Sequence, residues 1–211
     1  MNLKYFRFSK TELIHLFVST IALSFAFSLI LYRKQIYPGF NYNLMFFINS
    51  LIIVGFAFIL HEELGHKLVA QKYGCWAEYR AWPTGLFFAV ALAVMSKGGF
   101  VFAAPGAVMI SNIKEKEYGY EYVNLSDEKI GKIGIAGAVV NIILAVIFSG
   151  LTVLYASHVF SMAAIVNVWL ALFNMIPFGP LDGAKVMRWD KRIWIAMIGI
   201  CLALLFTIPY I

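Results

Sequence analysis

Four long stretches of the sequence carry no charged residue, and they restrict the possible folds more than any other feature. An α-helix needs about 20 predominantly apolar residues to cross a bilayer, and each stretch is long enough to do so. A shorter apolar run, residues 44–60, meets no helix-stop signal and continues as predicted helix to about residue 73. Together these stretches predict five membrane-spanning helices, over residues 13–32, 44–73, 133–155, 159–178 and 193–211.

The composition excludes a soluble fold. Of the 211 residues, 62% are hydrophobic and 13% are charged, against roughly 45–50% and 25% in ordinary globular proteins. A soluble domain of this size could not bury so much apolar surface, so lipid must surround much of the chain. We therefore expect an all-α polytopic membrane protein with no room for a separate soluble domain.

Basic residues predict the orientation of these helices. The first span follows Lys4, Arg7 and Lys10, but its apolar run is too long for a signal peptide and has no A-x-A cleavage site. If the N-terminus is cytoplasmic and the spans alternate, every Lys and Arg except Arg33 and Lys34 lies on the cytoplasmic side, as the positive-inside rule requires. The net charge of +6 then reflects the topology of a multi-pass protein of the cell membrane, and no basic patch remains for nucleic acid.

Between the second and third spans, residues 83–111 are apolar but interrupted by prolines and glycines. Residues 86–95 are too few to cross the bilayer. Residues 75–82 and 100–111 look extended, the latter as two β-like arms around a Pro-Gly turn. Non-helical backbone at membrane depth is stable only where protein buries it or where it lines a wet cavity. We expect a re-entrant element over about residues 83–111 that enters and leaves on the cytoplasmic face, which makes five to six membrane helices in all.

Very few ionisable side chains lie within or beside the spans. His61, Glu62, Glu63 and His66 lie in the second span, and Asp182 follows the fourth. Such groups are costly in lipid and are functional candidates by default. Two imidazoles and a carboxylate give Zn²⁺ three ligands and leave its fourth position open, as hydrolytic zinc sites require. An adjacent glutamate can then accept a proton from the attacking water.

Three motifs carry these residues. Residues 60–67 read LHEELGHK, residues 134–141 read GIAGAVVN, and residues 174–183 read NMIPFGPLDG. In this order they resemble the zinc motif, the glycine-rich stretch and the NxxPxxxLDG signature of the site-2 protease family of intramembrane metalloproteases. The resemblance covers about residues 44–186.

Membership of that family implies a zinc endopeptidase that cleaves transmembrane segments of substrate proteins near the cytoplasmic face of the bilayer. It also implies that His61, His66 and Asp182 hold the zinc, that a glutamate is the base, and that Asn174 helps to stabilise the oxyanion. Asn141 and Asn174 are also residue types that bond between membrane helices without a catalytic role. The chain resembles a minimal form of the family without a soluble regulatory domain, and its sequence indicates no oligomeric state.

One residue too many separates the two histidines. The family spacing is HExxH, whereas four residues lie between His61 and His66 here. On a regular α-helix, positions i and i+5 lie about 140° apart, against about 40° for i and i+4, so the two imidazoles would not face one metal. A π-bulge would restore a shared face and keep Glu62 as the base. Alternatively, a regular helix would make Glu62 a ligand and Glu63 the base. We favour the bulge because imidazole is the commoner zinc ligand.

The extra residue also supports a second class of function, in which the chain is a catalytically inactive protease-like protein that binds metal as a scaffold or transporter. A single compact ligand cluster, without a relay of polar residues along successive helices, argues against transport. For a protease, residues 100–111 have a further expected role, because unpaired backbone there could hold an unwound substrate by β-addition.

Overall fold

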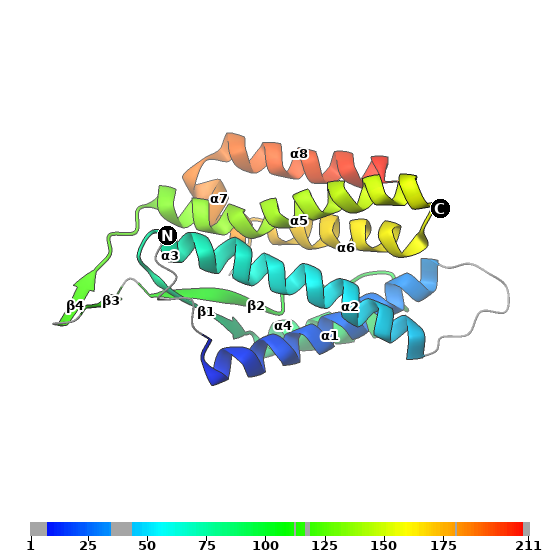
Figure 1. Cartoon of the computed structure of the whole chain (residues 1–211), viewed down its shortest axis with the longest axis horizontal. Helices are drawn as coiled ribbons and strands as arrows, with labels where there is room; N and C mark the ends of the chain where they lie inside the picture. The colour runs from blue at the N-terminus through cyan, green and yellow to red at the C-terminus, as the bar shows by residue number, and fades with distance from the viewer. Residues whose placement is uncertain (1–7, 35–43, 112, 117–118, 180, 209–211) are drawn as a thin grey trace.

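The computed structural model describes residues 8–34, 44–111, 113–116, 119–179 and 181–208. Its long helices lie side by side along the long axis of the molecule, and the strands lie toward one end (Figure 1). Lys4 and Arg7, which contribute to the predicted orientation, and residues 209–211 of the last expected span lie outside the described residues. In chain order the elements are α1 (Lys10–Lys34), α2 (Leu44–Ile59), the π-helix η2 (Leu60–Lys67), α3 (Leu68–Lys72), β1 (Trp76–Ala81), α4 (Pro83–Met95), β2 (Gly106–Ser111), β3 (Ile113–Lys116), β4 (Gly119–Tyr122), α5 (Asp127–Tyr155), α6 (His158–Asn174), α7 (Asp182–Trp189) and α8 (Lys191–Thr207).

Three helices in the described part of the chain are long and apolar enough to cross a membrane. They are Lys10–Ile30 within α1, the continuous helix Leu44–Lys72 formed by α2, η2 and α3, and α5. The fourth and fifth expected spans contain α6 and α8, of 17 residues each, and the expected re-entrant region contains the 13-residue α4. The chain is thus mostly helical with three candidate spans, and a count of five to six stays a prediction.

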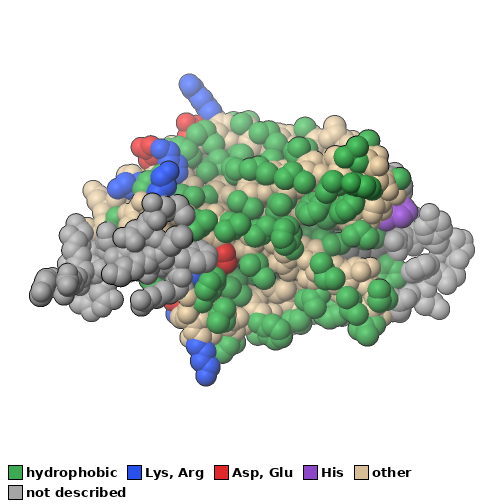
Figure 2. Space-filling model, in the orientation of Figure 1, with side chains coloured by type: hydrophobic (Ala, Val, Ile, Leu, Met, Phe, Trp, Pro, Cys, Tyr) green, Lys and Arg blue, Asp and Glu red, His purple; other side chains and the backbone are tan. Residues whose placement is uncertain are grey.

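Charged side chains are concentrated toward one end of the molecule. On the face shown in Figure 2, hydrophobic side chains cover the long helices, whereas the charged side chains lie toward the end that carries α7 and the strands. Large apolar side chains are exposed on the helix surfaces; for example, Leu154 on α5 and Phe206 on α8 are 75% and 87% exposed. Apolar surface of this extent is typical of contact with a membrane.

Strands β1 and β2 pair in an antiparallel sheet, with Trp76 opposite Ser111 at one end. The extended segment predicted at residues 75–82 is therefore confirmed as β1. The other edge of β1 lies against α1, because the Tyr79 N–H donates to Glu12 Oε1 (2.9 Å) and the Ala81 N–H donates to His15 Nδ1 (3.2 Å). Strands β3 and β4 form a separate antiparallel pair that projects beyond the helices at the same end (Figure 1).

The predicted hairpin within residues 100–111 is wrong. Its second arm is β2, which pairs with β1, and its first arm forms no strand. The first arm enters the core instead: Val101 is completely buried, and its carbonyl accepts a hydrogen bond from Trp169 Nε1 on α6 (3.3 Å). A side chain thus satisfies the Val101 carbonyl in place of a partner strand.

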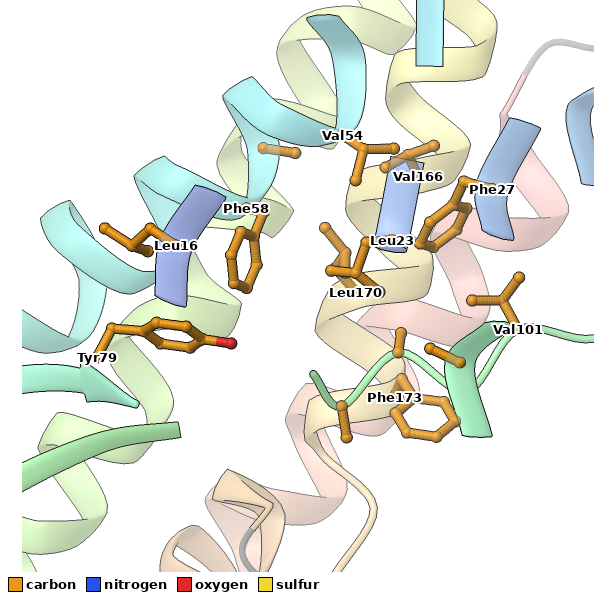
Figure 3. Packing of buried hydrophobic residues seen from close by; sticks show 14 of the residues in the cluster. Leu16, Leu23, Phe27, Val54, Phe58, Tyr79, Val101, Val166, Leu170 and Phe173 are labelled. Carbon is orange, nitrogen blue, oxygen red and sulfur yellow. The ribbon is translucent and has the colours of Figure 1, made fainter. Parts of the chain in front are cut away.

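The largest core joins α1, α2, β1 and α6. Buried apolar side chains from these elements meet there (Figure 3): Leu16, Leu23, Phe27, Val54, Phe58, Tyr79, Val166, Leu170 and Phe173. The rings of Phe58 and Tyr79 pack edge to face with centroids 5.4 Å apart. The core thereby holds α1 and β1 against the helix that contains the histidine motif.

Candidate metal centre

The histidine motif lies in a π-helical segment. The π-helix η2 interrupts the long helix 44–72 for eight residues, and the Leu68 N–H bonds to the Glu63 carbonyl, five residues earlier. In an α-helix, that bond would reach the carbonyl four residues earlier. The structure therefore contains the π-distortion that the sequence favoured, over eight residues and not as a single-residue bulge.

This π-helix brings the two histidines together. Because a π-turn closes on residue i+5, His61 and His66 lie on one face of the helix, and their Nε2 atoms are 3.0 Å apart. Both side chains are buried. The alternative of a regular helix, with Glu62 in a ligand position, is not what the structure shows.

Asp182 completes the cluster from a distant part of the chain. The backbone turns after α6, with Gly179 at a φ of +57°, and α7 begins at Asp182. The Asp182 Oδ2 atom lies 3.0 Å from His66 Nε2. One ligand atom each from His61, His66 and Asp182 all lie within 4.8 Å of one another, and all three residues are buried.

The three donors fit a zinc ion. Two nitrogens bound tetrahedrally at about 2.0–2.1 Å from zinc are about 3.3 Å apart, close to the 3.0 Å between His61 Nε2 and His66 Nε2. The room for both rings comes from Gly137 on α5, since a Cβ there would lie 2.7 Å from His61 Nε2 and closer still to His66 Nε2. A glycine at this position is therefore a requirement of the cluster.

Each imidazole is also held on its other nitrogen by α5. The His66 Nδ1 atom lies 2.7 Å from the Ile133 carbonyl oxygen. A carbonyl only accepts, so His66 Nδ1–H donates and Nε2 keeps its lone pair toward the cluster. The His61 Nδ1 atom lies 3.0 Å from Asn141 Nδ2 of the side-chain amide. Bonds to the outer nitrogen orient imidazoles for metal binding.

Lys185 holds the second oxygen of Asp182, with Nζ 2.8 Å from Oδ1. Burial by itself raises the pKa of the Asp182 carboxyl, but the contact with His66 and the charge of Lys185 outweigh burial and hold this pKa below its ordinary range. Asp182 is therefore ionised at neutral pH, with Oδ1 engaged by Lys185 and Oδ2 directed toward the histidines.

The two glutamates of the motif have different surroundings. Glu62 is buried, and its Oε2 atom has no hydrogen-bond partner among the described residues. The carboxylate oxygens of Glu63 also have no hydrogen-bond partner among the described residues, but unlike Glu62 this residue forms an ion pair, with Oε2 3.1 Å from Lys67 Nζ.

Lys67 connects Glu63 to the N-terminal helix. The Lys67 Nζ atom lies 2.8 Å from Glu12 Oε2 on α1, and both side chains are almost completely buried. The ring of Phe8 covers the same ammonium group, 4.0 Å from its centroid. Since Glu12 also accepts the Tyr79 N–H, this network joins η2, α1 and β1, and Glu63 belongs to it.

Comparison with known proteins finds one relative that matches nearly the whole chain. A protein of Methanocaldococcus jannaschii named "Putative zinc metalloprotease" is 41% identical over 202 residues, which cover 92% of each chain. This chain belongs to that protein's family. The name of this relative fits the buried His61, His66 and Asp182 cluster, which could hold a metal. No family model matches the chain, and no solved structure matches it.

Asn174, which was expected to stabilise an oxyanion in a metalloprotease, is the last residue of α6. Its side chain is half-buried, and Nδ2 donates to the Leu170 carbonyl of the same helix (3.0 Å). The catalytic role of Asn174 stays a prediction.

Sequence reasoning missed three residues of this family member's centre: Glu12, Lys67 and Lys185. The two lysines were interpreted only as cytoplasmic charges. A local signal was present, because Lys67 lies four residues after Glu63 and Lys185 three after Asp182, and opposite charges at these spacings pair on a helix. No local signal identifies Glu12, which lies 55 residues from Lys67.

Proposed function

We propose that this chain is an intramembrane zinc endopeptidase of the site-2 protease family that cleaves transmembrane segments of other proteins near the cytoplasmic face. One observation carries the proposal: His61 and His66 lie in a helix apolar enough to cross a membrane and form a buried cluster with Asp182. Glu62 lies in the same helix, next to His61 in the sequence. The name of the archaeal relative supports metalloprotease chemistry. The apolar helices support a site at membrane depth.

Each residue of the centre has its own role in the proposed hydrolysis of the peptide bond. His61, His66 and Asp182 would hold Zn²⁺ and leave one position open. Bound zinc supplies a Lewis acid that polarises the scissile carbonyl and makes a water molecule more acidic. Glu62 accepts the proton of the attacking water and returns it to the leaving amine. Its Oε2 atom has no competing partner among the described residues, which suits this role.

Glu63 is the weaker candidate for the base. Its carboxylate is paired with Lys67, which is in turn paired with Glu12. To take a proton from water, Glu63 would have to leave a buried ion pair, and this is costly. We therefore assign a structural role to Glu63.

We assign to Asn174 the role of stabilising the oxyanion by a hydrogen bond. An amide NH₂ group has two hydrogens, and the bond to the Leu170 carbonyl uses one of them. The other hydrogen is free to donate to the developing negative charge, in the manner of an oxyanion hole.

The predicted orientation supports cleavage near the cytoplasmic face. Charged side chains gather at the end of the molecule that carries α7 (Figure 2), and α7 contributes Asp182 and Lys185 to the centre. The positive-inside rule assigns that end to the cytoplasm. With 17 residues each, α6 and α8 reach the lower limit of about 17–25 residues for a span and complete the five proposed spans.

An unwound substrate is proposed to add as a strand to β2. The outer edge of β1 is already bonded to Glu12 and His15 of α1. The outer edge of β2 pairs with no strand in the described ranges, and β2 contacts η2. A strand bound there would lie close to the histidine helix with its amides unprotected by helical bonds.

The extra residue between His61 and His66 no longer argues for an inactive protein. That argument assumed a regular α-helix, in which the rings of the two histidines would face in different directions. In the π-helix their Nε2 atoms lie 3.0 Å apart, so the spacing is compatible with a working metal centre.

The test measures zinc and cleavage on the same purified protein. The full chain in detergent is expected to bind a single zinc ion and to cut a model transmembrane substrate. Chelation should abolish cleavage, and added zinc should restore it. Glu62→Gln should keep the zinc and lose cleavage. Wild-type protein that carries zinc but cleaves no faster than Glu62→Gln would contradict the proposed activity.

A further inference from the structure

Three residues of α5 form a strip against the two histidines. Ile133, Gly137 and Asn141 are spaced four residues apart, so they lie on one face of the helix. Ile133 contributes its carbonyl to His66, Gly137 leaves room for both rings, and Asn141 places its amide 3.0 Å from His61 Nδ1. The strip thus contacts both imidazoles.

Asn141 is the only one of the three whose side chain bonds to a histidine. An imidazole that binds metal through Nε2 carries its hydrogen on Nδ1. The partner of His61 Nδ1 must then accept, which means that the amide oxygen of Asn141 faces it. In the structure the amide nitrogen Nδ2 lies at this position, 3.0 Å from His61 Nδ1. A half turn about the last side-chain bond exchanges the two ends of the amide and brings Oδ1 to the same position.

The opposite orientation is incompatible with metal binding by His61. If the amide nitrogen of Asn141 donated to His61 Nδ1, the hydrogen of the ring would lie on Nε2. That hydrogen would point toward His66 Nε2, only 3.0 Å away, and the lone pair needed by a metal would be absent. The amide of Asn141 therefore determines which nitrogen of His61 is available.

A packing role does not explain an asparagine at this position. Asn141 is completely buried, and one atom of its amide has no hydrogen-bond partner among the described residues. A buried amide atom without a partner costs free energy, and an apolar side chain of similar size would avoid that cost. The contact with His61 offsets it.

We propose that Asn141 is a positioning residue for the metal centre: it accepts the Nδ1–H of His61 and so directs the lone pair of Nε2 toward the metal. This inference rests on the proposed zinc site and deepens it, because it assigns to α5 the control of both ligand histidines. Ile133 does for His66 through the backbone what Asn141 does for His61 through its side chain.

The test compares Asn141→Leu and Asn141→Asp in the full-length protein. Loss of an outer hydrogen bond to a metal-binding histidine typically lowers metal affinity by about 10–100-fold. Asn141→Leu should show a loss of this size in zinc affinity, measured by chelator competition, and a changed absorption spectrum with Co²⁺ in place of zinc. Asn141→Asp keeps the acceptor and should bind zinc at least as tightly as the wild type.

Asn167 on α6 supplies the matched control. It is a second buried asparagine with one unpartnered amide atom, and it donates to the Ala163 carbonyl of its own helix (2.9 Å). Asn167→Leu makes the same chemical change away from the histidines and should leave zinc affinity and the Co²⁺ spectrum unchanged. An equal loss of zinc in Asn167→Leu would show a general packing effect and overturn the proposal.

The outcomes separate this inference from the proposed function. Asn141→Leu with wild-type zinc affinity and an unchanged Co²⁺ spectrum would overturn the role of Asn141 alone. Asn141→Asp with weakened binding would do the same, and this variant decides the matter even if Asn141→Leu fails to fold, because it preserves the shape of the side chain. A wild-type chain that takes up no zinc would instead overturn the metal centre itself.

Discussion

Lys67 on η2 and Glu12 on α1 form an almost completely buried ion pair, with 2.8 Å between Nζ and Oε2. The pair connects the N-terminal helix to the helix that carries both histidines. Since Glu63 shares the same lysine, the second glutamate of the motif contributes to this connection. The stability of the protein and the proposed choice of Glu62 as the base therefore both depend on one lysine.

Lys67→Met is expected to destabilise the protein by about 3–5 kcal/mol, the usual cost of leaving a buried charge unpaired, because both Glu12 and Glu63 lose their partner. Glu12→Gln should cost less, since Lys67 keeps Glu63. Thermal unfolding of the protein in detergent, followed by circular dichroism, measures both. Lys132→Met removes an exposed pair with Glu128 and should have no measurable effect. Equal shifts for Lys67→Met and Lys132→Met would refute a structural role for the buried network.

Substitutions of the two glutamates of the motif should have different effects in a cleavage assay. Loss of a general base lowers the rate by about 10²–10⁴-fold, and this is expected for Glu62→Gln with zinc content unchanged. Glu63→Gln should retain most of the activity and instead lower the stability by about 1–3 kcal/mol, since it weakens a charged contact with Lys67. The reverse pattern, an active Glu62→Gln and an inactive Glu63→Gln, would assign the base to Glu63.

Gly137→Ala is expected to remove the metal while leaving the helix intact. The added Cβ would lie 2.7 Å from His61 Nε2, so the rings must move apart, and overpacking of this kind costs about 1–3 kcal/mol. Gly150→Ala on the same helix is the control, because its Cβ would meet nothing within 4 Å. Zinc content per chain, determined by atomic absorption, should fall in the first variant and not in the second. Full zinc occupancy in Gly137→Ala would show that the cluster tolerates a Cβ there.

The proposed strand addition predicts which backbone N–H groups matter. The N–H groups of Tyr79 and Ala81 point away from β2, so Ile110, opposite Ala77 in the register, points its own N–H away from β1 by the alternation of antiparallel pairs. Ile110→Pro removes this donor and should lower kcat/KM by about 2–10-fold, since one hydrogen bond contributes about 0.5–1.5 kcal/mol.

Met109→Pro provides the contrast for this edge. Its N–H faces β1 by the same alternation, so the substitution should break the β1–β2 sheet and lower the melting temperature. Ile110→Pro should leave the melting temperature close to that of the wild type. Wild-type cleavage by Ile110→Pro would exclude this edge as the binding site for substrate.

Much of the architecture followed from the sequence, because the cost of charge in lipid is a local property. Long uncharged stretches predicted α1, the helix 44–72 and α5. The same cost made His61, His66 and Asp182 conspicuous, and the structure brings these three together. Imidazole chemistry also favoured the π-distortion over a regular helix, as observed in η2.

The tertiary structure decided what depends on partners far away in the chain. The ion pair that favours Glu62 over Glu63 as the proposed base involves Lys67, which also pairs with Glu12 from another helix. The proposed role of Asn141 depends on His61, 80 residues away. Strand β2 pairs with β1, while the arm that was expected to pair with it bonds to Trp169 through the Val101 carbonyl. The sequence by itself determined which ionisable side chains are costly in lipid and are therefore functional candidates. Only the packed structure determined their partners, because hydrogen bonds and ion pairs depend on distances in space that local spacing does not encode.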